Sequence, residues 1–164
     1  MEHVAGRLPQ AYDDAMTTRE LRADPGVDYE LVRFVRRARA YAIENLEGIH
    51  PELDYNTFVI LLAVHDAPEG VRASDLVGEL FVHKSTISRA VSTLERLGLL
   101  DRVTHPNDGR AQLLTVPKGA RERIEAFRTG SFAWLGSLLA DWSADEVQTF
   151  ARQLSRLNDA AEKK

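Results

Sequence analysis

The sequence contains no cysteine. Disulfide bonds, iron–sulfur clusters, thiolate zinc sites and cysteine-based peroxide sensors are therefore excluded. Long apolar runs are also missing, because no stretch approaches the roughly 18 residues that a membrane-spanning helix requires. The first residues do not combine a basic region with an apolar one, so we expect a cytoplasmic protein.

The motifs of common enzyme classes are missing as well. The sequence lacks the dinucleotide fingerprint Gly-x-Gly-x-x-Gly, a phosphate-binding loop, the nucleophile elbow Gly-x-Ser-x-Gly and the zinc motif His-Glu-x-x-His. His83, Ser85 and Ser88 are close in sequence, but no carboxylate is placed to orient the histidine. No two histidines have the spacing of metal ligands on a helix. We therefore expect no catalytic residues, no metal and no cofactor.

The charge is distributed unevenly along the chain. The whole chain of 164 residues has a formal net charge of −4, and its 44% apolar and 28% charged residues are ordinary for a globular protein. Residues 81–110, in contrast, contain five basic and three acidic residues, a net charge of +2. Local positive charge on an acidic body is typical of a sequence-specific nucleic-acid binder.

A clear helical pattern follows His83. Apolar residues there recur at three- and four-residue spacing, which predicts an amphipathic helix: Ile87, Ala90, Val91, Leu94 and Leu97. The opposite face carries hydroxyls and cations: Ser85, Arg89, Ser92 and Arg96, with Thr86, Ser88 and Thr93 beside them. Short hydroxyls permit close approach to a DNA major groove, and arginine reaches base edges or phosphates. An ordinary solvated face has the same periodicity, so this pattern alone leaves both interpretations open.

The residues after this helix favour DNA binding. Gly98 is suited to end the helix in a left-handed cap, and the extended runs 99–105 and 110–116 flank the turn sequence PNDG. A hairpin directly after an amphipathic helix, with Arg102 and Arg110 near its ends, is the wing of a winged helix-turn-helix.

The residues before His83 predict the remaining parts of this motif. Asp54 is a good cap for a buried helix through residues 57–65, which the turn sequence at residues 67–70 ends. Residues 71–72 are placed to add a short third strand to the wing. Ser74 is then expected to cap the next helix, which crosses the DNA backbone in front of the recognition helix.

These segments resemble the MarR family of transcriptional regulators. The matching stretches are HKSTISRAVSTLERLGLLDR and PNDGRAQLLTVPKG, and order and spacing agree over Val27 to Asp159. The most specific part, residues 108–110, falls on the family's wing pattern Asp-x-Arg. The resemblance implies that Arg110 contacts the minor groove and that Asp108 orients the wing.

The chain departs from the family's pattern at three places. Phe81 stands in the turn before the recognition helix, where glycine is usual, and His105 stands where an aspartate commonly opens the wing. Thr115-Val116 replaces the usual Leu-Thr before the following helix. The exchange at Phe81 bears on the geometry of the turn, because glycine adopts backbone conformations that other residues avoid.

The DNA contacts that we predict come from the recognition helix and the wing. The helix enters the major groove, where Arg89 reads guanine, while Arg102 holds a phosphate. The predicted DNA-binding residues are Lys84, Ser85, Thr86, Ser88, Arg89, Arg102, Asn107, Asp108 and Arg110.

Helical patterns at both ends of the chain predict a partner surface. They cover residues 27–47, residues 118–140 and the segment that opens with a capping box at Ser143–Glu146. A small winged domain leaves these helices nothing to pack on, and the family resemblance also implies a homodimer. The predicted interface residues are Phe34, Trp134, Leu135, Leu138, Phe150, Leu154 and Leu157.

A small-molecule site is expected from the resemblance, because MarR-type proteins commonly bind small, often aromatic acids between the dimer helices and the DNA lobe. The candidate lining residues are Arg37, Tyr41, Phe58 and His65. From the residues alone, the arginines of the first helix also fit an ordinary solvated face, and the aromatic residues also fit the core.

These inferences give a mainly α fold with a small β-wing. We predict a mobile segment at residues 1–26, a first dimerisation helix at 27–50, a winged helix-turn-helix DNA-binding domain at 51–116 and C-terminal dimerisation helices at 117–164. The predicted function is that of a homodimeric transcriptional regulator, a repressor relieved by a small ligand, which binds a pseudo-palindromic double-stranded operator. The alternative is a winged-helix module that binds proteins and not DNA.

Overall fold

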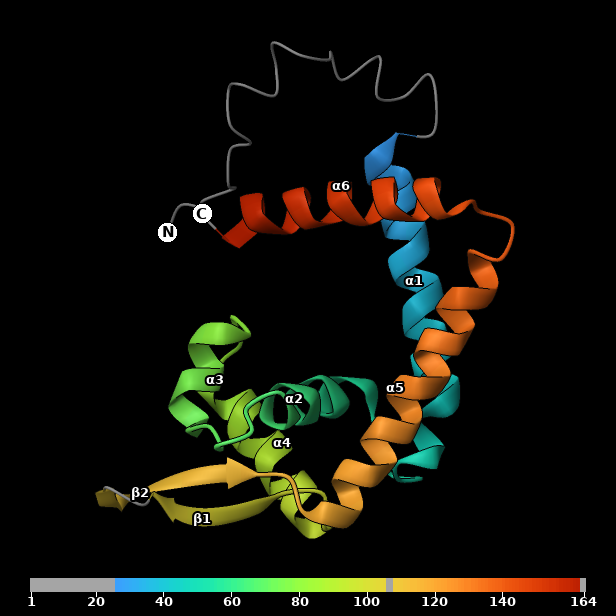
Figure 1. Ribbon diagram of the computed structural model, residues 1–164. Helices are drawn as coiled ribbons and strands as arrows, with labels where there is room; N and C mark the ends of the chain where they lie inside the picture. The colour runs from blue at the N-terminus through green and yellow to red at the C-terminus, as the bar shows by residue number, and fades with distance from the viewer. Residues whose placement is uncertain (1–25, 106–107, 163–164) are drawn as a thin grey trace. The chain divides into compact units, whose positions relative to one another are not determined.

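The computed structural model describes residues 26–105 and 108–162, apart from the side chains of Arg110 and Glu162. The element order, labelled in Figure 1, is α1 (Val27–Asn45), η3 (Leu46–Gly48), α2 (Tyr55–His65), α3 (Ala73–Glu79), α4 (Lys84–Arg96), β1 (Asp101–His105), β2 (Asp108–Thr115), α5 (Lys118–Leu138) and α6 (Ala144–Glu162). The chain is mainly helical with a small antiparallel sheet, which confirms the predicted fold class. The predicted mobile segment, except for Gly26, lies outside the described residues.

Contacts divide the chain into two compact units, residues 1–44 and residues 45–164. The described part of the first unit belongs to α1, whose first turn carries two acidic residues that stabilise the positive end of the helix dipole. Several large apolar side chains of α1 are exposed: Val27, Tyr29, Leu31, Val32, Phe34, Val35 and Ile43. The expected apolar stripe is therefore exposed at Leu31, Phe34 and Val35 and buried at Ala42.

The core of the second unit holds the helix-turn-helix together. One side of α4 is buried, as its apolar spacing predicted: Ile87, Ala90, Val91 and Leu94. It packs with α2 and α3 in one cluster that includes Leu61, Leu76 and Leu114. Full burial of each such side chain stabilises the fold by about 1.5–3 kcal/mol. This cluster fixes α4 in place and leaves its other side outward.

Two helix starts show which caps the sequence predicts correctly. Asp54 caps α2, because its side chain accepts hydrogen bonds from the backbone N–H groups of Asn56 at 2.9 Å and Thr57 at 3.1 Å. Burial alone would raise the pKa of Asp54, but the bonds from Thr57 and Asn56 outweigh it and hold that pKa below its ordinary value. The cap predicted at Ser74 is wrong. Arg72 occupies the N-cap position of α3 without a side-chain bond, and Ser74 bonds Asp75 instead.

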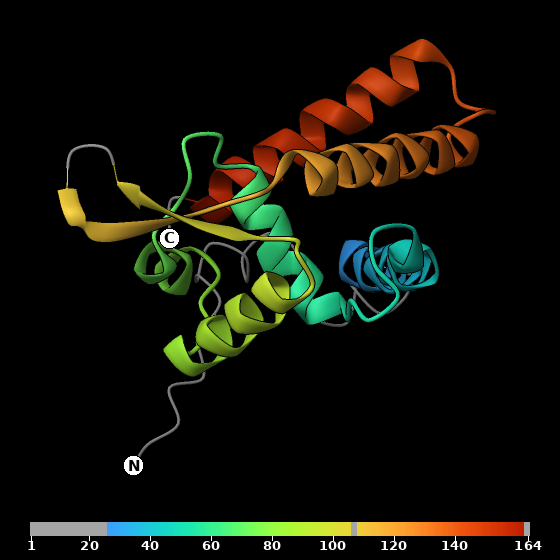
Figure 2. The same ribbon diagram turned by 90° about the horizontal axis from the view of Figure 1, so that it is seen from below.

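The sheet forms the predicted wing. Strands β1 and β2 pair antiparallel, with Val103 opposite Leu113, and Figure 2 shows them side by side next to the helices. Val71 adds the expected third strand as a single bridge to Leu114, with N–O distances of 3.1 and 2.8 Å. Gly70, with φ +85°, allows this approach, because a Cβ there would lie 3.0 Å from Thr115 Cγ2.

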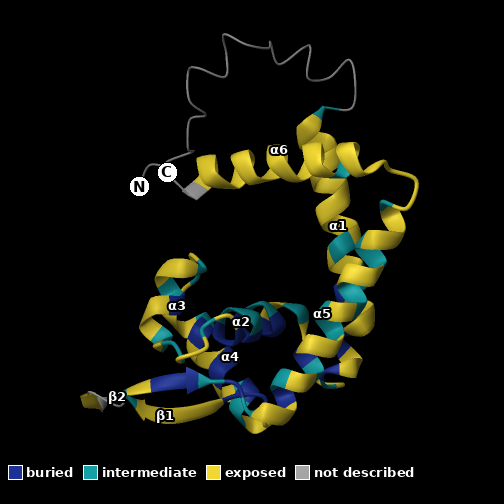
Figure 3. Cartoon of the chain, in the orientation of Figure 1, coloured by how far each residue is buried: buried dark blue, intermediate teal, exposed yellow. Residues whose placement is uncertain are grey.

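The C-terminal helices differ in how far they pack. Residues Ala120 and Ile124, near the start of α5, are buried, and Arg123 donates a hydrogen bond to the carbonyl of Ile49 at 2.8 Å. In contrast, α6 is exposed along its described length except for the half-buried Val147, as Figure 3 shows. Its start is the predicted capping box, since Ser143 N–H donates to Glu146 at 2.8 Å. Hydrogen bonds from the hydroxyl and the backbone of Ser143 lower the pKa of Glu146.

Candidate nucleic-acid interface

The outward side of α4 is polar and open. Lys84, Ser85, Ser88 and Arg89 are exposed, and Thr86 is half-buried. Figure 2 shows α3 and α4 as neighbours, an arrangement that the core cluster also supports. The side chains that the sequence predicts to meet DNA thus share one uncovered face of a helix whose other face is fixed in the core.

Arg89 lies along its own helix in the free chain. Its Nε donates a hydrogen bond to the carbonyl of Ser85 at 3.2 Å, and Ser92 Oγ donates to the carbonyl of Ser88 at 3.0 Å. Both bonds are exposed, so a competing acceptor such as a base edge or a phosphate replaces them at small cost. The terminal guanidinium nitrogens of Arg89 are the groups available for two-point recognition of guanine.

The turn between α3 and α4 contains a residue in an uncommon conformation. Phe81 has φ +51°, which places it in the left-handed region that glycine tolerates and other residues avoid. Its side chain is 94% exposed. The turn therefore has the backbone conformation that glycine usually provides, although a phenylalanine stands at this position.

The wing residues are joined to the helices by ion pairs. Arg102 of β1 contacts Glu95 of α4 through two bonds, Nε to Oε1 at 2.6 Å and Nη2 to Oε2 at 3.2 Å. Asp108 lies 3.7 Å from Arg72, at the start of α3. These pairs tie the wing to both helices of the motif. Asn107 lies outside the described residues, as does the side chain of Arg110.

Phe58 and His65, the predicted ligand-lining residues of α2, are buried against α5. The ring of Phe58 meets the edge of Phe127, with centroids 4.8 Å apart. Nε2 of His65 lies 2.9 Å from Glu125 Oε1. The geometry is not that of a hydrogen bond, so the contact is electrostatic. The predicted pair Arg37 and Tyr41 belongs to α1, in the other unit.

An ion pair beside His65 completes this junction between α2 and α5. Asp66 contacts both the His65 imidazole and the guanidinium of Arg128. Burial alone would raise the pKa of Asp66, but the hydrogen bonds from His65 and Arg128 and the charge of Arg128 hold it below its ordinary value. Sequence periodicity could not find this junction, because its partners lie on different helices.

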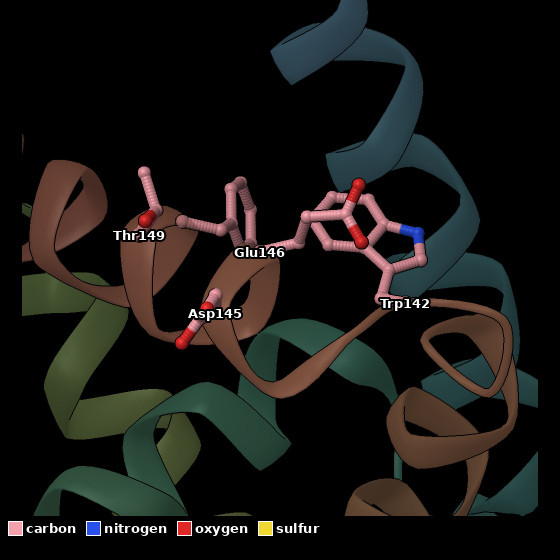
Figure 4. A pocket seen from close by; sticks show the side chains of 5 residues that line it. Trp142, Asp145, Glu146 and Thr149 are labelled. Carbon is pink, nitrogen blue, oxygen red and sulfur yellow. The ribbon is translucent and has the colours of Figure 1, made fainter.

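Two hollows on the described surface lie away from the junction between α2 and α5. One of ≈ 390 Å³ is bordered by residues around the start of α6, and Figure 4 shows their side chains: Trp142, Asp145, Glu146, Thr149 and Phe150. Another, of ≈ 330 Å³, is bordered by α1 residues that include Arg37. Among the described residues, no three histidine, aspartate or glutamate side chains are grouped so that they could hold a metal ion. Within the same residues, no helix is both long and apolar enough to cross a membrane.

Comparisons with known proteins show which family the helix-turn-helix and the wing resemble. Residues 52–111, which hold α2 to the wing, match the model of the MarR family. The uncharacterized HTH-type transcriptional regulator YxaD of Bacillus subtilis (strain 168) is 28% identical over 134 residues, covering 82% of this chain and 92% of that protein. The crystal structure of MarR superposes with a TM-score of 0.68 at 25% identity, covering 84% of this chain and 98% of that one. Residues 52–111 belong to the MarR family.

This match, the related HTH-type regulator and the likeness to the MarR structure support a DNA-binding transcriptional regulator of the winged helix-turn-helix type. A solved structure of Streptococcus pneumoniae FabT in complex with DNA shares the fold, with a TM-score of 0.72 at 21% identity, covering 84% of this chain and 96% of that one. The shared fold extends beyond residues 52–111 into the flanking helices of this chain.

Proposed function

We propose that this MarR-family chain is a homodimeric repressor that binds a pseudo-palindromic DNA site and is released by a small ligand. The observation that carries the proposal is the polar face of α4, open to solvent beside the wing while the opposite face is buried. A helix of this kind fits the B-DNA major groove, which is about 12 Å wide.

Each proposed DNA contact has a distinct role. Lys84, Ser85, Thr86 and Ser88 approach the backbone and base edges at the N-terminal half of α4, and Arg89 reads guanine. In the wing, Arg110 reaches the minor groove together with Asn107, and Arg102 holds a phosphate. Asp108 orients the wing, a role supported by its distance of 3.7 Å from Arg72.

In the free chain the guanidinium of Arg102 is paired with Glu95, so a phosphate that binds Arg102 has to share or break this pair. The Arg102 side chain is 43% exposed, so one side of it is open to solvent. A phosphate approaching from that side shares the guanidinium with Glu95 or displaces it. Exposed ion pairs contribute only about 0–1 kcal/mol, so the exchange is inexpensive.

The uncovered apolar faces support a second copy as partner. The proposed interface combines residues of α1, α5 and α6: Phe34, Trp134, Leu135, Leu138, Phe150, Leu154 and Leu157. Five of these side chains are exposed in the single chain, and Trp134 and Leu135 are half-buried. A monomeric protein rarely leaves so many large apolar side chains uncovered along three helices. A two-fold dimer then presents two α4 helices about 34 Å apart, which requires two half-sites of opposite orientation.

The junction between α2 and α5 supports control by a ligand. Phe58 is 3% exposed and His65 is 7% exposed. An effector that contacts Phe58 or His65 therefore has to separate α2 from α5, whereas Arg37, on α1, is exposed and Tyr41 is half-buried. Such a ligand binds one arrangement better than the other, and it lowers DNA affinity by that difference.

A winged-helix module that binds a protein remains the second candidate, since the same exposed helix face can meet a polypeptide. The test is a fluorescence-anisotropy titration of the dimer with duplex DNA from the region flanking its own gene, at several salt concentrations. A scrambled duplex of the same composition serves as the control. We expect tighter binding to the flanking DNA and a linear fall of log K with log salt.

A triple variant separates the two candidates. Lys84→Ala, Arg89→Ala and Arg110→Ala together remove three positive charges from the proposed interface. We expect this variant to lose binding to the flanking DNA, whereas Arg152→Ala, which removes one charge from exposed α6, retains it. Equal binding of the wild type to both duplexes, or no effect of the triple variant, contradicts the proposed function.

A further inference from the structure

We infer that Phe81 is a DNA-backbone contact, with its ring packing on a deoxyribose of the bound duplex next to the phosphate nearest α4. The inference rests on the proposed function, because it names a further residue of the same interface. It goes beyond the hydroxyl and cationic face of α4, since the contact is apolar and comes from the turn.

The first observation is the backbone of Phe81. Three of the described residues have a positive φ: Gly70 at +85°, Gly98 at +64° and Phe81 at +51°. The chain uses glycine at the other two positions, where a side chain is strained. At Phe81 it instead carries a large side chain in a conformation that disfavours it.

The second observation is the exposure of the ring. Phe81 is 94% exposed, so its side chain adds almost nothing to the core cluster that holds α3 and α4. The neighbouring turn residue Val82 is partly buried against that cluster. The phenyl group thus carries a conformational cost and gives no packing in return within the described chain. A role outside the single chain explains both facts.

The third observation is the position of the turn. Phe81 lies two residues before His83, the N-cap of α4, and His83 and Lys84 are exposed beside it. His83 makes no side-chain cap bond. In a docked helix-turn-helix, the first helix crosses the DNA backbone and the start of the second enters the groove. The turn that joins them therefore lies at the sugar-phosphate backbone.

The chemistry of the backbone fits an aromatic ring at that place. A deoxyribose presents C–H groups between two phosphates, and a phenyl ring buries them while Lys84 meets the phosphate. A sugar carries no sequence information and no charge. The ring is therefore expected to strengthen binding to every duplex alike and to leave the salt dependence unchanged.

The test combines folding stability with DNA affinity in three variants of the full chain. Phe81→Gly and Phe81→Asn both remove the ring and relieve the backbone strain, since glycine and asparagine accept a positive φ. We expect both to raise Tm and to weaken binding to the flanking duplex and the scrambled duplex about tenfold. Phe81→Tyr keeps the ring and the strain, and we expect wild-type Tm and affinity.

Salt titrations distinguish this contact from an ionic one. The slope of log K against log salt should be the same for Phe81→Gly and the wild type, whereas Lys84→Ala should make it shallower. Unchanged DNA affinity in Phe81→Gly and Phe81→Asn, with raised Tm, overturns the inference and points to a protein partner for the ring. Wild-type protein that binds neither duplex overturns the proposed function itself, which separates the two failures.

Discussion

Nε2 of the buried His65, in α2, lies 2.9 Å from Oε1 of Glu125, in α5. Beside it, Asp66 contacts Arg128 of the same α5 helix. These two pairs join the helix-turn-helix core to the helix that leads to the proposed dimer surface. For the proposed ligand control, we propose that they link the proposed dimer helices to α4, because α2 packs with α4 in the core.

The first prediction concerns the stability of this junction. Asp66→Asn removes the charge that Arg128 contacts, and we expect it to lower the free energy of unfolding by about 0.5–1 kcal/mol at pH 7, the range of partly exposed ion pairs. Chemical denaturation of the dimer measures the loss. Asp159→Asn, the same exchange on exposed α6, should have no comparable effect.

The pH dependence of this difference follows from the lowered pKa of Asp66. The folded state favours the ionised carboxylate, so its contribution is complete above the ordinary value of 3.8 and is lost as pH falls through the lower folded value. The wild type and Asp66→Asn should therefore converge in stability under acid. A difference that stays constant from pH 7 down to acid unfolding contradicts the assignment.

The second prediction concerns the pair formed by Arg102 and Glu95. Arg102→Ala should weaken binding to the flanking and scrambled duplexes alike and make the salt slope shallower by about 0.9, the value for one phosphate contact. Glu95→Gln frees the guanidinium and should strengthen binding to both duplexes. Anisotropy titrations measure both variants. If Glu95→Gln weakens binding, the pair serves DNA recognition by positioning Arg102, and free competition with phosphate is the wrong description.

The third prediction concerns the uncovered face of α6. Leu157→Asp places a charge among exposed apolar side chains, and burying that charge in a dimer costs several kcal/mol. We expect a shift from dimer to monomer in sedimentation and a loss of operator binding. Ser155→Asp introduces the same group away from the stripe and should stay dimeric. If the Leu157→Asp protein stays dimeric, α6 is not part of the dimer interface.

Sequence patterns predicted the parts of this fold that depend on local spacing. The buried side of α4, the caps at Asp54 and Ser143, the left-handed Gly98 and the wing pairing all follow from periodicity or turn chemistry. Ser74 failed as a cap because the helix begins two residues earlier than expected, so that Arg72 occupies the N-cap position.

The contacts that the sequence could not predict join residues on different helices and strands. The pairs Arg102–Glu95 and Asp108–Arg72 arise because the wing folds back toward the helices. His65, a candidate ligand-lining residue from the family resemblance, lies 2.9 Å from a carboxylate of Glu125 on α5, a neighbour that the sequence did not predict. Only the tertiary arrangement decides whether a polar residue faces a ligand or another helix.

The central claim, that α4 reads base edges, is tested most directly by the affinity of Arg89→Ala for operator and scrambled duplexes at one salt concentration. We expect a loss of about 1–3 kcal/mol on the operator and a smaller loss on the scrambled duplex, so that discrimination between them falls. Operator affinity equal to that of the wild type, in a variant that is folded and dimeric, would contradict the proposed docking of α4.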